Sequence, residues 1–256
     1  MKNLKHYIQE KLFHQQVDEK LIVNKNYDSY QYHPKTCKEL RQLIIDRYEE
    51  QGPGTEQEPI DLNDIDVSRI DTFYNHTENC GLFEYGKFEY INVSSWDVSN
   101  VENMCRTFFN CTNLKSVDLS NWDVLNVENT YRMFEKCINL KSIGNISNWD
   151  VSSVEDMSSM FSNCYKLEYI GNLSNWKVLK VKQMYKMFYG CEKLKSIGNL
   201  SKWDVSNIGD MNKMFYGCEM LKSVGDLSNW NISSVYAMSQ MFDNSGITNI
   251  PKWYKE

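Results

Sequence analysis

The chain contains eight cysteines, which are its most reactive side chains, and five of them are evenly spaced. This column consists of Cys111, Cys137, Cys164, Cys191 and Cys218, at steps of 26 or 27 residues. Thiols in register could form disulfides or bind zinc. A zinc site needs closely spaced ligands, and the chain has no C-x-x-C pair and only four histidines. We therefore interpret the column as buried free thiols, whereas Cys37 and Cys105 lie outside it and could be exposed.

A column of aspartates at the same interval is a second set of possible metal ligands. Asp97, Asp123, Asp150 and Asp204 belong to it, and Lys177 stands in the same row. A Ca²⁺ ladder needs several oxygen ligands for each ion, which a lysine would oppose. Asx turns are the favoured role of these aspartates, and no metal or other cofactor is predicted.

Catalytic motifs are missing from the sequence. It contains no nucleophile elbow, zinc-protease helix, phosphate loop or dinucleotide fingerprint. The histidines, which could serve as catalytic bases, are His6, His14, His33 and His76, and all precede the regular part of the chain. We predict that the chain is not an enzyme.

The even spacing reflects an internal repeat of about 27 residues. Trp recurs at positions 96, 122, 149, 176, 203 and 230, and Phe follows each Trp by twelve residues. An exposed Trp ladder could stack on sugars or bases, but Val two and five residues later favours burial. The predicted repeat core comprises Trp122, Trp149, Trp176, Trp203, Phe134, Phe161, Phe188, Phe215, Cys137, Cys164, Cys191 and Cys218.

The apolar spacing within one unit predicts its local structure. Four apolar residues of the unit that begins at residue 176 are Met184, Met187, Phe188 and Cys191. Their i, i+3, i+4, i+7 spacing is typical of a short helix. Leu194, Ile197 and Leu200 then follow the spacing of a leucine-rich-repeat strand. Each unit is expected to hold one or two short strands and one or two helical turns.

These units predict an α/β repeat solenoid, a leucine-rich-repeat-like stack of about seven units over residues 61–256. A single unit cannot bury its own apolar faces, so neighbouring units must supply the burial. The first unit is weaker: Ile65 aligns with Trp96, which places Cys80 in the cysteine column. In this alignment the first unit is lengthened by extra residues around Leu82 to Phe88.

Residues 1–60 lie outside the repeat and are predicted to form a small α+β N-terminal cap. Leu4, Ile8 and Leu12 share one helical face, and residues 21–23 could pair with residues 30–32 as strands. A capping box at residues 36–39 opens a second helix, which Gly52 ends. Either this segment closes the first unit or it is an anchoring module for a larger assembly.

Charge and hydropathy limit the partners. With 28 Lys and Arg against 34 Asp and Glu, the net charge of −6 argues against nucleic acid. No signal peptide or membrane span is visible, so the expected location is the cytoplasm or a virion, with the cell surface as an alternative. A lysine row forms the candidate interaction surface, interrupted by Glu168, and its members are Lys115, Lys141, Lys195 and Lys222.

The units also resemble a known family. Leu-Ser-Asn-Trp-Asp-Val followed by Met-x-x-Met-Phe-x-x-Cys-x-x-Leu is similar to the BspA-like leucine-rich repeat surface proteins and mycoplasma-type lipoproteins, over roughly residues 61–254. The resemblance implies non-enzymatic binding of a protein or glycan partner, with host or receptor recognition as one form. Residues 32–36 and 61–66 are similar to bacteriophage-encoded members, which implies a structural or accessory part of a phage virion as the alternative.

Overall fold

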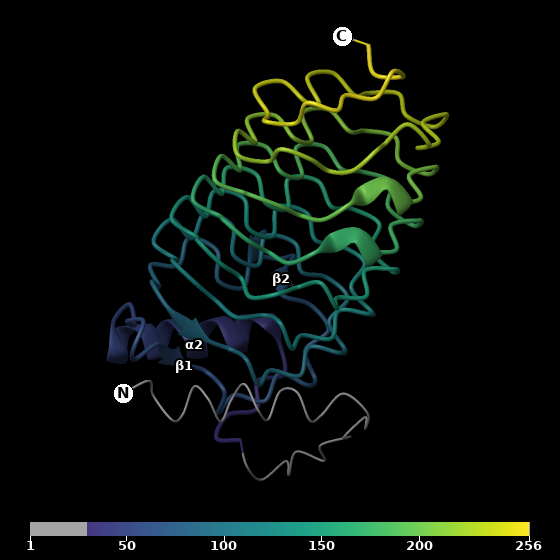
Figure 1. Ribbon diagram of the computed structural model, residues 1–256. Coiled ribbons are helices and arrows are strands. Elements are labelled where there is room, and N and C mark those ends of the chain that lie inside the picture. Colours follow the sequence, from purple (N-terminus) through teal and green to yellow (C-terminus); the bar gives the residue numbers. More distant parts are fainter. Residues whose placement is uncertain (1–29, 256) are drawn as a thin grey trace, which may run out of the picture.

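The computed structural model describes residues 30–255. Figure 1 shows a stack of coils that the chain climbs from its purple end to its yellow end. Isolated parallel bridges join each coil to the next, and they fall in two rows. The first row joins Thr72, Asn103, Asn129, Asp156, Gln183, Asp210 and Ala237, and the second joins Tyr90, Ser116, Ser142, Tyr169 and Ser196. Bridged residues are one repeat apart, which confirms the repeat fold.

Regular secondary structure is sparse along this stack. The elements are α2 (Cys37–Gln51), β1 (Ile60–Asp61), β2 (Tyr74–Asn75), β3 (Cys80–Gly81), β4 (Ile91–Asn92) and the 3-10 helices η2 (Leu173–Asn175) and η3 (Leu200–Lys202). β1 pairs in parallel with β4, and β2 pairs antiparallel with β3. We number the regular coils 1 to 6, beginning at residues 96, 122, 149, 176, 203 and 230 respectively.

The predicted leucine-rich-repeat strand is shorter than its spacing suggests. Among residues 194–200 of coil 4, Ser196 alone bridges to the coil before it, through Tyr169, and Leu200 already opens η3. Leu194, Ile197 and Leu200 are nonetheless fully buried. The spacing therefore predicted which side chains face inward but not the length of the strand.

The predicted helical turns are wrong. Residues 184–191 form consecutive β-turns, in which the Met187 N–H donates to the Met184 carbonyl at 3.1 Å. Lys186 and Gly190 have φ angles of 54° and 70°, whereas an α-helix needs negative φ throughout. Positive φ at the third residue is the mark of a type II turn.

Bonds between coils explain why the turns imitate helical spacing. The N–H of Lys186 donates to the Asn212 carbonyl and that of Phe188 to the Met214 carbonyl, each at 2.9 Å. Alternate N–H groups thus bond the next coil, and the remaining ones close turns within their own coil. Because each turn returns the chain inward after three or four residues, buried residues acquire a helix-like period.

The predicted core columns are confirmed. The Phe, Trp and Cys side chains predicted to form them are at most 4% exposed. Each indole N–H is also satisfied between coils: Trp176 Nε1 donates at 3.2 Å to the carbonyl of Ile146, which lies 30 residues earlier in the chain. Sequence spacing missed one member, Trp253, which stacks on Trp230 at 6.3 Å and donates to Leu227 at 2.8 Å. This tryptophan ends the column.

The cysteines do more than fill space. Cys164 Sγ donates to the Phe134 carbonyl and Cys191 Sγ to the Phe161 carbonyl, each at 3.1 Å. All eight cysteines are free thiols. The possible exposure of Cys37 and Cys105 is wrong, because both are 7% exposed and burial raises their pKa values to about 12. Cys37 is buried at the start of helix α2, and Cys105 is buried in a turn of coil 1.

We expect a thiol reagent at pH 8 to label one cysteine rapidly in the folded protein. Cys80 is half-buried, whereas the other seven thiols are buried and inaccessible to the reagent. Titration with 5,5′-dithiobis(2-nitrobenzoic acid) should count one fast thiol without denaturant and eight in denaturant. Fewer than eight in denaturant would reveal disulfides, and several fast thiols would contradict the burial of the column.

The first unit departs from the predicted alignment. Phe83 belongs to the Phe column, since its ring stacks on Phe108 at 4.8 Å. Cys80 instead lies in the β2–β3 hairpin, outside the cysteine column. The extra residues therefore form this hairpin and do not lie around Leu82 to Phe88, because a two-stranded excursion leaves the neighbouring bridges undisturbed.

Helix α2 closes the first unit. Thr36 Oγ accepts the Glu39 N–H at 3.2 Å, as the capping box predicts, and Gly52 ends the helix with a φ of 74°. Leu40 and Ile44 are buried against the stack. The predicted helix at residues 4–12 and the strand at 21–23 lie outside the described residues, and Tyr32 bridges to Ile65.

One side chain of α2 occupies the place that a preceding coil would take. The Arg41 guanidinium donates to the carbonyls of Gly81 and Leu82, each at 2.6 Å, and of Glu84 at 3.1 Å. These carbonyls face the end of the stack. A buried carbonyl without a donor is costly, so the helix supplies both apolar cover and hydrogen bonds. The described part of the segment therefore covers the first unit, and its assignment as a cap or an anchoring module stays a prediction.

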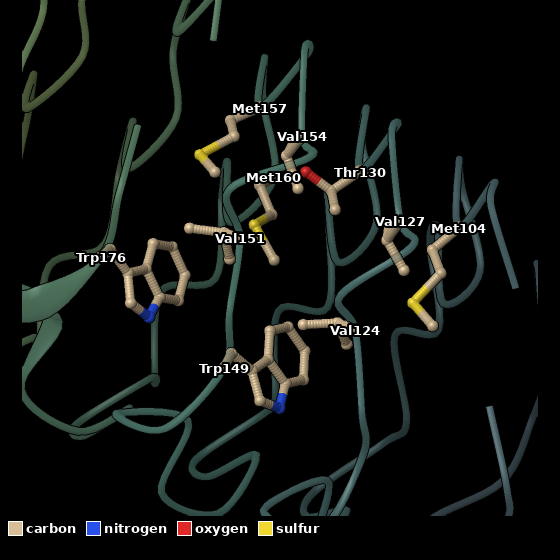
Figure 2. Close-up of a pocket in the computed structure, with 10 residues that line it drawn as sticks. All are labelled: Met104, Val124, Val127, Thr130, Trp149, Val151, Val154, Met157, Met160 and Trp176. Carbon is tan, nitrogen blue, oxygen red and sulfur yellow. The ribbon is translucent and has the colours of Figure 1, made fainter. Parts of the chain in front are cut away.

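A small cavity lies in the core at coil 2, where Thr130 stands in place of the methionine that the other regular coils have. Figure 2 shows Thr130 between the levels of Met104 and Met157, where the other regular coils also place Met. The cavity measures about 10 Å³ and is lined almost wholly by apolar side chains. Thr130 Oγ1 donates to the Asp156 carbonyl, which also accepts the Thr130 N–H at 3.0 Å.

We expect Thr130→Met to raise the free energy of unfolding by about 1 kcal/mol. The larger side chain fills the cavity, and the Asp156 carbonyl keeps the backbone N–H as its donor. Thr130→Ala enlarges the cavity and should lower stability. Urea unfolding of the two variants measures both effects. If Thr130→Met destabilised the protein, coil 2 would have closed over the space that methionine needs.

Candidate binding surface

The β-turns decide which side chains reach solvent. Within residues 104–111 of coil 1, Met104, Thr107, Phe108 and Cys111 face the core. The residues between them lie on the outer side of the coil, four in each coil, and some of them are buried beneath their neighbours. We call the surface they form the turn face. Its residues are Cys105, Arg106, Phe109, Asn110, Tyr131, Arg132, Glu135, Lys136, Ser158, Ser159, Ser162, Asn163, Tyr185, Lys186, Tyr189, Gly190, Asn212, Lys213, Tyr216, Gly217, Ser239, Gln240, Asp243 and Asn244.

Aromatic rings and cations hold one another on coils 4 and 5 of this face. Tyr189 and Tyr216 stack at 5.0 Å with an interplanar angle of 11°. Lys186 Nζ lies 5.0 Å from the ring centroids of both Tyr185 and Tyr189. Lys213 Nζ lies 5.9 Å from the Tyr216 ring. Such contacts attract a cation to the ring face and fix the positions of the ammonium groups.

Coils 1 and 2 carry a second group of the same kind. The Arg132 guanidinium lies 4.8 Å from the Tyr131 ring centroid and forms an ion pair with Glu135 at 3.1 Å. Lys136 Nζ lies 5.6 Å from the Phe109 ring. Phe109 itself is 6% exposed because these long side chains cover it.

Coil 3 separates the two groups with short side chains. Ser158, Ser159 and Ser162 are 6%, 4% and 1% exposed. They lie one coil away from Arg132 on one side and one coil away from Lys186 on the other. A row of serine hydroxyls therefore lies between two rows of long cationic and aromatic side chains.

The predicted lysine row is brought together, but it is not a cationic surface. Lys115 pairs with Glu89 and Lys195 with Glu168, each at 2.5 Å, in the same column. Lys222 Nζ donates to a backbone carbonyl at 3.1 Å, and Lys141 is exposed. The pairing with Glu168 lowers the pKa of that carboxyl. The role of the row as an interaction surface stays a prediction.

The aspartate column forms the predicted Asx turns. Asp150 Oδ1 accepts the Ser152 N–H at 3.0 Å and Asp204 Oδ1 accepts the Ser206 N–H at 3.1 Å. Hydrogen bonds from Ser152 lower the pKa of Asp150. Within residues 30–255, no three His, Cys, Asp or Glu side chains come close enough to hold a metal ion.

Sequence reasoning missed the turn face, although a signal was present. Once residues 184–191 are interpreted as a helix, the residues between the apolar ones fall on one polar side without order. Tyr and Lys or Arg recur at those places in coils 2, 4 and 5. Their alignment into rows appears only when neighbouring coils bond in register.

Comparison with known proteins gives a family and one distant structure. A family described as "Mycoplasma protein of unknown function, DUF285" matches residues 70–196 and 137–253. A crystal structure of a leucine-rich repeat protein from Eubacterium ventriosum is 18% identical, with a TM-score of 0.47. The match covers 73% of this chain and 44% of that one. No curated protein matches the chain.

These matches bear on two earlier expectations. The family match confirms the resemblance to BspA-like repeats, whereas the weaker resemblance to phage-encoded members stays a prediction. In the part of the chain that the structure describes, no helix has the length and apolarity needed to cross a bilayer.

Proposed function

Because the chain belongs to the DUF285 family, which carries no described activity, we propose from its own geometry that it is a non-enzymatic binding protein. Its exposed side-chain columns would hold a macromolecular partner, a protein or a glycan. Host or receptor recognition is the form of binding that the family resemblance suggests.

The observation that carries this proposal is the contrast between core and surface among the coils. Each regular coil repeats Trp and Phe at the buried places, whereas the thirteenth residue after each Trp is Phe, Glu, Ser, Tyr, Tyr and Asp in turn. A stack needs the same core in every coil. Its exterior is under no such demand, and it presents a wide array of different side chains on a rigid support, as binding solenoids do.

The reactive groups support a role without catalysis. The buried thiols donate hydrogen bonds to backbone carbonyls, and burial raises the pKa of Cys218 to about 12. A nucleophilic cysteine needs the opposite shift. The carboxylates of the aspartate column hold backbone N–H groups. Both sets are therefore engaged in maintaining the stack.

The test is binding of the purified chain to arrayed glycans and purified proteins, with the mass of each bound ligand measured afterwards. We expect saturable binding to at least one ligand, which is recovered unchanged. Three variants locate the face: Tyr185→Ser with Tyr189→Ser, Lys141→Glu, and Leu125→Ser with Leu179→Ser. Each introduces a residue that another coil has at that place. One variant should lose binding and the others keep it; no saturable ligand, or a chemically altered one, overturns the proposal.

A further inference from the structure

We propose that the turn face binds an acidic polysaccharide, one whose sugars carry carboxylate or sulfate groups. This inference rests on the proposed binding function and narrows it to one face and one ligand chemistry. It is carried by three features of the turn face: its surplus of positive charge, the contacts on its aromatic rings and the bonding of most of its backbone N–H groups within the stack.

The first feature is charge that opposes the charge of the whole chain. The turn face holds five cationic side chains and two carboxylates, while the chain as a whole has a net charge of −6. Lys136, Lys186 and Lys213 have no carboxylate partner among residues 30–255. The lysine row, by contrast, is partly neutralised by Glu89 and Glu168. Complementary charge therefore favours an anion at the turn face.

The second feature is that contacts within the protein already occupy faces of the aromatic rings. Tyr189 stacks on Tyr216, and Lys186 lies over the rings of Tyr185 and Tyr189. Stacking on a nucleobase or on the apolar face of a neutral sugar needs a free ring face. What this surface offers is ammonium groups and phenol hydroxyls. These donate hydrogen bonds to carboxylate or sulfate oxygens.

The third feature separates a polysaccharide from an acidic peptide. Backbone N–H groups of the turn face already bond the next coil, as Lys186 does with the Asn212 carbonyl, so strand addition to this face is blocked. Its apolar members, Cys105 and Phe109, are buried and offer no anchor for a protein. A peptide would have only its acidic side chains to offset the entropy lost on ordering its backbone. A polysaccharide presents hydroxyls and charges on stiffer rings.

The serines of coil 3 give the place where such a chain would lie. Ser158, Ser159 and Ser162 have cationic rows on both sides, with Arg132 on coil 2 and Lys186 on coil 4. Because these three serines are buried, a polysaccharide lying over coil 3 would meet the positive charge on either side and not the serine hydroxyls. Its acidic groups could then pair on both flanks.

The experiment measures binding by the folded chain to heparin, polygalacturonate, neutral dextran, poly-glutamate and poly(dT). We expect saturable binding to heparin, polygalacturonate or both, weakened by added salt, with none to dextran. The heparin and polygalacturonate arms separate sulfate from carboxylate recognition. Lys186→Glu with Lys213→Glu should raise the dissociation constant at least about tenfold. The control, Lys141→Glu with Lys202→Glu, changes the net charge equally on exposed residues away from the turn face, and should change the constant less than about twofold.

A second variant tests the same surface in case the protein with both Lys→Glu substitutions does not fold. Tyr185→Ser, Lys186→Ser and Tyr189→Ser copy onto coil 4 the serines that coil 3 already holds at the same places. It should also lose the polysaccharide while keeping the circular dichroism spectrum and melting temperature of the parent. Equal loss in the control, or poly-glutamate or poly(dT) bound as tightly, overturns the inference. If both acidic polysaccharides fail while an arrayed ligand binds, the inference falls and the binding function stands; if nothing binds, both fall.

Discussion

Replacing Phe188 with alanine should lower the free energy of unfolding by about 3–5 kcal/mol. Phe188 is fully buried, and its ring stacks between Phe161 at 5.6 Å and Phe215 at 5.8 Å. Truncation removes apolar burial and leaves a cavity that the neighbouring rings cannot close, because each is held by the coil on its far side. Phe161→Ala should have an effect of the same size for the same reason.

Urea unfolding followed by both circular dichroism and tryptophan fluorescence measures the loss, and coincident transitions show that one free energy applies. Tyr165→Ala is the matched control, since Tyr165 is 39% exposed and lies on the same stack. Its cost should stay below about 1 kcal/mol. A loss below about 1 kcal/mol for Phe188→Ala would mean that the Phe column is not the core of the stack.

Glu84→Ala should cost about 3 kcal/mol, near the lower end for breaking a buried ion pair. Glu84 is 2% exposed, accepts the Gly81 N–H at 2.7 Å and pairs with Arg106. Alanine leaves that N–H without its acceptor and the guanidinium without its counter-charge. Arg106 is partly solvent-exposed, with 18% of its side chain accessible, which keeps the expected cost at that lower end.

Two further variants serve as controls for Glu84→Ala. Glu84→Gln keeps an acceptor for the Gly81 N–H and should cost less than alanine. Glu155→Ala removes the partner of Lys182 from an ion pair at 2.6 Å whose side chains are 50% and 61% exposed. That exposed pair is screened by solvent, so its loss should destabilise the protein much less than Glu84→Ala does. Equal losses for Glu84→Ala and Glu155→Ala in urea would show that burial of the first pair adds nothing.

Some features of the site were within reach of the sequence and others were not. The positions of Lys115 and Lys195 in one row follow from spacing alone. Their neutralisation by Glu89 and Glu168 depends on the conformation of each side chain in the stack, which spacing does not predict. The register of the first unit was also out of reach, because a hairpin can be inserted at several places without changing the apolar pattern.

The spacing of residues along the chain is enough to predict which side chains are buried and that the chain repeats. Trp, Phe and Cys at a constant interval can share a core only if every unit repeats the same shape, so periodicity alone fixes the stack. The bounds of helix α2 were also predictable from the sequence, because Thr36, Glu39 and Gly52 act through local hydrogen bonds and φ angles.

The path of the backbone between those residues depends on contacts between coils, which spacing does not reveal. An isolated segment such as residues 184–191 has the apolar period of a helix, and a helix would satisfy its N–H groups internally. In the stack, carbonyls of the neighbouring coil accept hydrogen bonds from alternate N–H groups, so the segment forms turns and not a helix. These turns place Tyr185, Lys186 and Tyr189 on the outer side of the coil. The turn face is therefore a product of bonds between residues about 27 apart, which no local pattern contains.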